Sequence, residues 1–109
     1  KRIRNSRSRD IYLDLGYILS ILVYRKEHIN LFIKLVSKEL KNIDSNQHLI
    51  LDFTNTLSVS YNFIKTTCNK LVSNKVVTKD LYDNNIIILG NKKTKESFIK
   101  YFEYYLNKL

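Results

Sequence analysis

The stretch from Leu51 to Leu89 restricts the possible folds most, because it reads as a helix, a tight turn, a second helix and a β-hairpin in succession. Asp52 is a candidate N-cap for the short first helix. Phe53 and Leu57 are four residues apart and would share one face of it. Ser58 and Val59 are expected to form the turn. This order of elements predicts a mainly α-helical domain with one small β-hairpin.

The second helix of this stretch, residues 60–73, has an apolar and a polar face, with Ser60 as its expected N-cap. Apolar residues recur at steps of three and four, the helical period: Phe63, Ile64, Cys68, Leu71 and Val72. The other face carries side chains that can contact phosphates or base edges: Tyr61, Asn62, Lys65, Thr66, Asn69 and Lys70. Between Phe53 and Lys79 there are four lysines and no carboxylate, which favours the approach of a polyanion.

The run from Phe53 to Val77 resembles the winged helix-turn-helix domains of bacterial and phage regulators, replication initiators and partition proteins. The matching positions are Thr54, Leu57, Val59, Ser60, Ile64, Leu71 and Val77. Ser58 and Lys75 depart from the pattern, because they stand where glycines with positive φ are common, and Asn74 is the expected substitute at the second position. The resemblance implies a winged helix-turn-helix with extra N- and C-terminal helices, whose residues 60–73 lie in the major groove of DNA. The alternative is a helical hairpin without a DNA role.

Two segments before this region are expected to extend the fold. Residues 1–9 hold five cations and no acid, which predicts a basic flexible arm that follows the DNA backbone or enters a minor groove through Arg2, Arg4 and Arg7. The alternative is a solubilising tail. Residues 10–109 form one domain. Residues 10–24 are apolar on nearly all sides but too short to span a bilayer, so they predict a buried helix, entered through a short extended piece at Ile11 to Leu13.

The remaining helices and strands follow from periodicity. Residues 25–42 give the clearest helix, with the stripe Ile29, Phe32, Ile33, Val36 and Leu40. A final helix is expected over about 94–108, capped by Thr94, and its stripe is Phe98, Ile99, Phe102, Tyr105, Leu106 and Leu109. Helices at about 11–24 and 94–108 together are too apolar for one small core, which predicts a homodimer.

The predicted wing consists of strands at Val76 to Leu81 and Ile86 to Leu89, joined by a turn at residues 83–85, with His48 to Leu51 as a further short strand. Asp80 and Asp83 put negative charge near the wing tip. We therefore expect the wing to brace the fold, with Lys79 or Lys92 touching the DNA backbone at most.

The composition indicates an anionic partner and no catalysis. The chain has a formal net charge of +9, a single cysteine and only two glycines. No glycine-rich phosphate loop is possible, and His28 and His48 lack ligand partners at metal-binding spacing. We expect no enzyme activity, metal, cofactor or small-molecule substrate, and no membrane segment. The lone cysteine fits a reducing cytoplasm.

The predicted function is sequence-specific binding of double-stranded DNA by a nucleoid-associated homodimer, serving plasmid or phage replication, partition or transcription regulation. Base contacts are expected from Tyr61, Asn62, Lys65 and Thr66, and phosphate contacts from Asn69, Lys70, Lys75 and the arginines of the arm. One alternative is a protein–protein interaction module with a basic surface, whose apolar end helices bind a partner. RNA binding is a third possibility.

Overall fold

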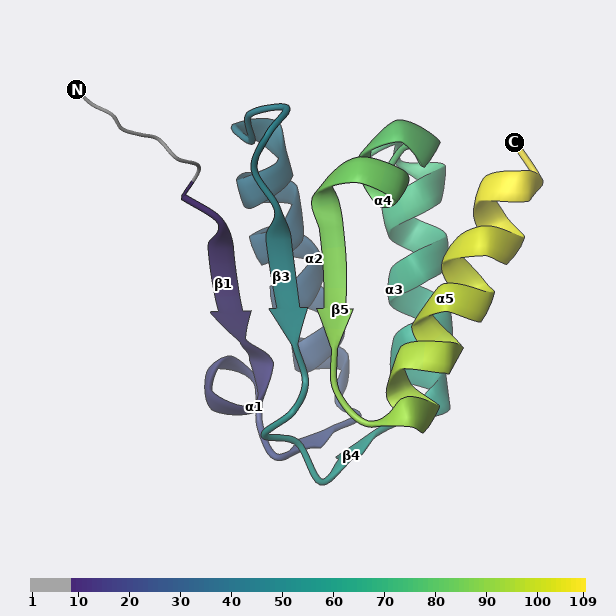
Figure 1. The fold of residues 1–109 in the computed structure, drawn as a ribbon. Coiled ribbons are helices and arrows are strands. Elements are labelled where there is room, and N and C mark those ends of the chain that lie inside the picture. Colours follow the sequence, from purple (N-terminus) through teal and green to yellow (C-terminus); the bar gives the residue numbers. More distant parts are fainter. Residues whose placement is uncertain (1–8) are drawn as a thin grey trace.

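Three short apolar runs form a parallel sheet in the computed structural model, which describes residues 9–109 (Figure 1). The strands are β1 (Ile11–Asp14), β3 (Leu49–Asp52) and β5 (Ile86–Leu89), in the order β1-β3-β5. Their register places Leu13 opposite Leu51, and Leu51 opposite Ile88. A second, two-stranded parallel sheet pairs β2 (Leu22–Val23) with β4 (Ser58–Val59). The central strand of the larger sheet is therefore β3.

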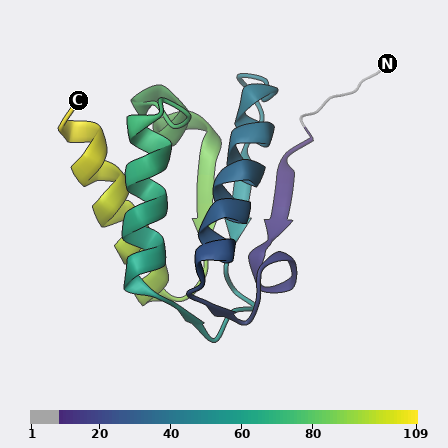
Figure 2. The same ribbon diagram turned by 180° about the vertical axis from the view of Figure 1, so that it is seen from behind.

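Two long helices, α2 (Lys26–Lys41) and α3 (Tyr61–Ser73), cover one face of the larger sheet, and a third, α5 (Lys92–Asn107), packs against α3 (Figure 2). The short helices α1 (Leu15–Ile18) and α4 (Lys79–Asn85) lie at the ends of strands, α1 directly after β1 and α4 directly before β5. Seen from behind the sheet, α3 lies between α2 and α5 (Figure 2). The strands follow one another across the sheet, so both crossovers run in the same direction and leave their helices on the same side. The three long helices all begin at the end of the molecule where the parallel strands finish (Figure 1).

The core lies between the sheet and these helices and is rich in phenylalanine. Phe53 stacks on Phe98 with ring centroids 4.9 Å apart, and the Phe32 and Phe63 centroids are 5.3 Å apart. Leu49 and Leu51 of β3 are fully buried against them. Offset and tilted rings of this kind add to the stabilisation that apolar burial provides. The core therefore joins all three long helices to the central strand.

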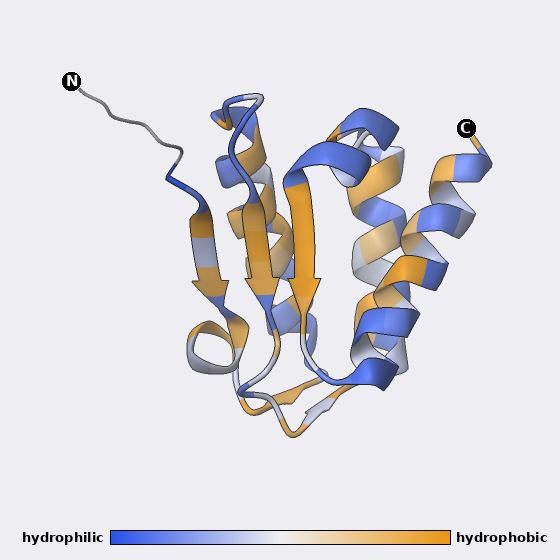
Figure 3. Ribbon diagram, viewed as in Figure 1, coloured by the Kyte–Doolittle hydropathy of each residue, from blue (hydrophilic) through white to orange (hydrophobic). Residues whose placement is uncertain are grey.

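The other face of the sheet has no helix over it in the described part of the chain (Figure 3). Its side chains are Tyr12, Asp14, Ile50, Asp52, Ile87 and Leu89, from alternate positions of the three strands. Tyr12 is 55% exposed, Ile87 36% and Leu89 37%. We call the apolar members, Tyr12, Ile50, Ile87 and Leu89, the open face. All-parallel sheets are almost always covered on both sides, so this face is unusual.

The predicted winged helix-turn-helix is wrong. That fold needs an antiparallel wing, whereas every strand pair among residues 9–109 is parallel. The predicted strand at residues 76–81 is instead a connection followed by α4. Thr78 caps this helix by accepting a hydrogen bond from the Leu81 N–H at 3.2 Å, and Lys79 pairs with Asp83 one turn later at 3.4 Å. These local helix signals determine the conformation of the segment that was expected to form a hairpin.

The first helix of the predicted helix-turn-helix is also wrong, because residues 53–57 form turns after β3. Asp52 ends the strand and accepts a hydrogen bond from the Thr54 N–H at 2.8 Å instead of capping a helix. Phe53 is buried but Leu57 is 75% exposed, so the two side chains share no face. Ser58 and Val59 belong to strand β4 and not to a turn.

Residues 10–24 do not form the predicted helix. They form β1, α1 and β2, so only the short extended piece at the start was expected correctly. A buried parallel strand and a buried helix both read as unbroken apolar runs, which explains the error. The predicted dimerisation helix at about 11–24 is therefore not present. None of the helices in the described part of the chain is long and apolar enough to cross a membrane.

Other elements are confirmed. The helices expected at 25–42, 60–73 and about 94–108 are α2, α3 and α5, and the strands expected at 48–51 and 86–89 are β3 and β5. Two details differ. The cap of α5 is Asn91, whose side chain accepts from the Thr94 N–H at 2.8 Å, so Thr94 is not the cap. The positive φ near the end of α3 occurs at Lys75, with a value of 62°, and not at Asn74.

Candidate nucleic-acid interface on α3 and α5

Helix α3 is positioned by its cap and its apolar face. The Ser60 hydroxyl accepts a hydrogen bond from the Phe63 N–H at 3.0 Å, as predicted, and satisfies a backbone donor at the start of the helix. The predicted apolar residues are all buried: Phe63, Ile64, Cys68, Leu71 and Val72. Burial raises the pKa of the Cys68 thiol well above its ordinary value, which keeps the thiol protonated. Cys68 is therefore a packing residue.

The outer face of α3 gathers most of the predicted site residues. Tyr61, Asn62, Lys65, Asn69 and Lys70 are exposed, and Thr66 is half-buried. The Thr66 hydroxyl donates to the Asn62 side-chain oxygen at 3.3 Å. Helix α3 contains no carboxylate, so this face can approach an anion without repulsion.

The other predicted residues lie elsewhere. Lys75 is exposed at the end of α3, while Lys79 is on α4 and pairs with Asp83. Arg2, Arg4 and Arg7 lie outside the described residues. Helix α3 has α2 on one side and α5 on the other (Figure 2). A helix that enters a major groove needs free flanks, and α3 does not have them. The outer face of α3 is therefore one part of a surface to which its neighbouring helices also contribute.

Helix α5 supplies residues that the sequence interpretation missed. A hollow of about 300 Å³ between α3 and α5 is lined by Lys65, Lys100, Tyr101 and Tyr104. We call it the lysine–tyrosine hollow. The Lys100 Nζ atom lies 5.5 Å from the centroid of the Tyr101 ring, a cation–π distance, and Tyr104 is half exposed. Tyr61 meets the Tyr101 ring edge-on, with centroids 5.2 Å apart, so it connects the hollow to the start of α3.

A sequence signal for these residues exists in the α5 segment. Lys93, Ser97, Lys100 and Tyr104 recur at steps of four, three and four, which places them on one stripe of a helix. The stripe lies beside the more apolar one that was read as a dimer contact. Lysines next to an apolar stripe are common on soluble helices, so the stripe alone does not predict a binding surface. The position of these residues beside α3 is known only from the fold.

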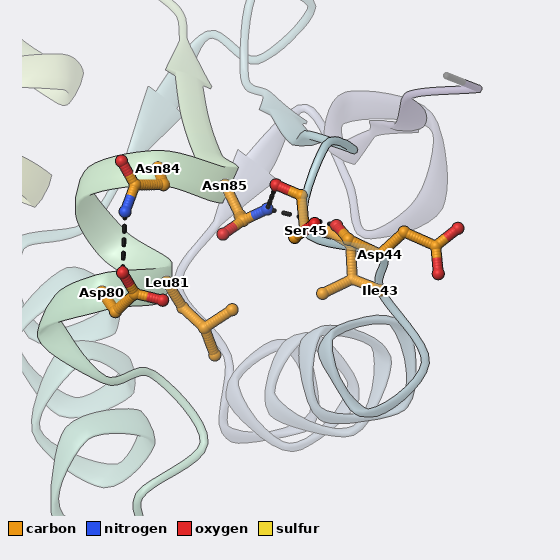
Figure 4. Close-up of a pocket in the computed structure, with 7 residues that line it drawn as sticks. All are labelled: Ile43, Asp44, Ser45, Asp80, Leu81, Asn84 and Asn85. Atoms are coloured by element: carbon orange, nitrogen blue, oxygen red, sulfur yellow. Dashed lines mark hydrogen bonds between the residues drawn. The ribbon is translucent and has the colours of Figure 1, made fainter. Parts of the chain in front are cut away.

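Another cavity, of about 550 Å³, lies beside the amino ends of β3 and β5, between the α2–β3 loop and α4 (Figure 4). Its buried Asn85 donates from Nδ2 to the backbone carbonyls of Asp44, Ser45 and Gln47 at 3.3, 3.2 and 2.7 Å. This amide holds the loop in place. The carboxylates of Asp44 and Asp80 at the same cavity disfavour an anionic ligand there.

Comparisons of this chain with protein-family models, curated proteins and solved structures find no match. Within residues 9–109, no cluster of three or more His, Cys, Asp or Glu side chains is arranged to hold a metal ion.

Proposed function

We propose that this protein binds nucleic acid through the outer faces of α3 and α5, without catalysis. The observation that carries the proposal is the lysine–tyrosine hollow, because two lysines and two tyrosines from different helices converge there. Lysines bind phosphates, and exposed aromatic rings stack on unpaired bases. Such a protein would act in the cytoplasm with the nucleic acid it binds.

The position of α3 favours single strands over duplex. A helix that reads bases must enter a major groove about 8.5 Å deep, which neighbouring helices on both flanks obstruct. A single strand needs only a shallow basic surface with aromatic platforms. Exposed Tyr61 and Tyr104 at the ends of this surface offer such platforms. If one duplex sequence binds more tightly than any single strand, the preference for single strands is wrong and α3 reads bases in a duplex.

The first prediction is that Lys65→Ala combined with Lys100→Ala weakens binding of a single-stranded oligonucleotide. Two lost phosphate contacts should reduce the slope of log affinity against log salt by about 1.4, since each single-strand contact contributes about 0.7. Fluorescence anisotropy at several salt concentrations measures this slope. The matched control is Lys34→Ala with Lys38→Ala, which removes the same charge from α2.

The outcomes separate a binding surface from general attraction. If both double variants reduce the slope equally, net charge alone governs binding and the hollow has no special role. If the Lys65/Lys100 variant binds as the unchanged protein does, the proposed interface is wrong. Tyr104→Leu, which keeps an apolar side chain without a ring, should weaken binding while leaving the salt slope unchanged.

A second candidate function is supported by the open face. It contains four partly exposed apolar side chains and no lysine or arginine, in a chain of net charge +9. The two carboxylates beside it on the same side of the sheet already accept hydrogen bonds: Asp14 from the Asn55 side chain at 2.9 Å, and Asp52 from Thr54 and Tyr12. We propose a second copy of the chain as the partner, because two such faces can pair without bringing cations together. This differs from the helix-mediated dimer expected from the sequence.

A further inference from the structure

A cavity of about 340 Å³ lies where α3 and α5 begin, at the carboxyl end of the parallel sheet. In open α/β sheets this end is where ligands usually bind. We call it the helix-start cavity. Its walls come from the segment around β4 and from the first two turns of α3 and α5, and they include Leu57, Ser58, Ile64, Lys93, Thr94 and Ser97.

The polar groups of this cavity suit an anion. They are the Lys93 ammonium group, the Asn91 amide and five hydroxyls, and none of the described lining residues is acidic; the hydroxyls are those of Ser58, Ser60, Tyr61, Thr94 and Ser97. Helices α3 and α5 have 13 and 16 residues, and both start at the cavity. The backbone N–H groups of a first helical turn lack partners within the helix, and the helix dipole favours negative charge there. Two helix starts therefore reinforce the lysine.

Thr94 supplies an independent observation that points to a ligand in this cavity. Only 6% of this residue is exposed, and it lines the cavity. Its backbone N–H donates to the Asn91 side chain, but its hydroxyl forms no hydrogen bond with any residue in the range 9–109. Buried hydroxyls nearly always have a partner, and an unpaired one destabilises the fold. An acceptor atom bound in the cavity would satisfy it.

We propose that the helix-start cavity binds a phosphate group carried by a small molecule or by the end of a nucleic-acid strand. The hydroxyls of Ser58, Thr94 and Ser97 and the ammonium group of Lys93 supply donors for its oxygens. The apolar walls, formed by Leu57, Val59 and Ile64, contact the group that the phosphate esterifies. A volume of about 340 Å³ is at the lower end of ligand cavities, which fits a phosphate with a modest substituent. The site is separate from the lysine–tyrosine hollow and goes beyond the proposed function.

The test uses the whole chain, with inorganic phosphate as the probe. Phosphate should shift the amide NMR signals of residues at the starts of α3 and α5 and raise the melting temperature, whereas chloride at equal ionic strength should not. Thr94→Val keeps the side-chain shape and removes only the hydroxyl. It should leave the unliganded protein at least as stable, because the unpaired hydroxyl is gone, and weaken phosphate affinity about tenfold or more.

Matched variants distinguish phosphate binding at this cavity from general attraction by the positive charge of the protein. Lys93→Met should weaken phosphate binding, while Lys95→Met, on the same turns of α5 but outside the cavity, should not. Unmoved signals at both helix starts, or equal phosphate affinity of Thr94→Val and the unchanged protein, would overturn the proposal. Equal losses for the two lysine variants would do so as well.

Oligonucleotide binding shows which kind of molecule carries the phosphate group. It also tests the phosphate site independently of the nucleic-acid proposal. Tighter binding of a 5′-phosphorylated oligonucleotide than of its 5′-hydroxyl form identifies a strand end as the ligand. Equal binding of the two forms, with phosphate binding retained, identifies a small phosphorylated molecule. If oligonucleotides fail to bind but phosphate still does, the nucleic-acid proposal fails and the phosphate site stands.

Discussion

Asp52 links the first strand of the sheet to the central one through its side chain. Its carboxylate accepts hydrogen bonds from the Tyr12 hydroxyl of β1 and from the Thr54 N–H of the following turn. Burial alone would raise the pKa of this carboxyl, but the hydrogen bonds from Thr54 and Tyr12 hold the pKa below its ordinary value. The group is therefore ionised at neutral pH, and its charge favours the folded state.

Replacing Asp52 with Asn keeps the shape and removes the charge, and we expect it to lower the free energy of unfolding at pH 7 by about 1.5–3 kcal/mol. Because the folded pKa lies below the unfolded one, the carboxylate's contribution is present above about pH 4 and is lost as pH falls through the folded pKa. Urea unfolding from about pH 3 to pH 7 measures it. A difference between the two proteins that stays constant with pH would contradict this role.

Asp52 also shows a limit of sequence interpretation. Helix caps and the turns that follow strands use the same residue types, because both need a short side-chain acceptor for a nearby N–H group. The Tyr12 partner is 40 residues away along the chain, so no local pattern reveals it. Ser60 was identified correctly because the helix that confirms it follows immediately in the sequence.

At the scale of elements, the three long helices were predicted well, whereas the two shorter predicted helices, at residues 10–24 and 53–57, and the pairing of strands were wrong. The 3.6-residue periods of α2, α3 and α5 are contained in the segments themselves. Parallel pairing is different, because its partners lie in distant segments and no turn sequence joins them. The hairpin expected at residues 76–89 relied on turn-forming residues 83–85, which also suit the last turn of the short helix α4.

The end of α3 is a Schellman motif with lysine where glycine is usual. The Val76 N–H donates to the Leu71 carbonyl at 2.9 Å, and the Lys75 N–H donates to the Val72 carbonyl at 3.0 Å. Lys75 adopts φ 62° to make this possible. The glycine-like character of position 75 was anticipated, but Asn74 was expected to adopt the positive φ in its place. The backbone around Lys75 therefore carries a conformational cost that a glycine would not.

Lys75→Gly should raise the free energy of unfolding by about 0.5–1 kcal/mol, because relief of the left-handed conformation outweighs the greater freedom of glycine in the unfolded chain. Asn74→Gly is the matched control. Asn74 has φ −86°, so glycine there should destabilise by a similar amount. Urea midpoints with unchanged slopes measure both effects. Destabilisation by Lys75→Gly would show that other contacts of the lysine dominate.

For the whole molecule, the distribution of charge and apolar surface separates the two candidate functions. Five of the 19 lysines and arginines lie in residues 1–9, so the described domain is less basic than the full chain. Helix α3 carries no carboxylate, while the side chains of the open face, on the other side of the sheet from α3, are apolar and partly exposed. A copy of the chain on the open face would leave α3 and α5 accessible.

If two copies pair through the open face, Ile87→Glu should convert a dimer to a monomer, because it places charges against the facing apolar side chains. Ile99→Glu on α5 is the matched control, since Ile99 is similarly exposed but lies outside the open face. Sedimentation velocity over a range of concentrations measures the mass. A monomeric unchanged protein, or a dimer that survives Ile87→Glu, would remove the open face from this role.

The strands lie side by side in the same sequence in which they occur along the chain, β1 then β3 then β5. During synthesis, each strand that leaves the ribosome therefore finds its neighbour already made and extends the sheet in one direction. No earlier strand has to move aside for a later one. Each addition still requires closing a connection of more than thirty residues, which makes assembly slower than for a helical bundle of equal length.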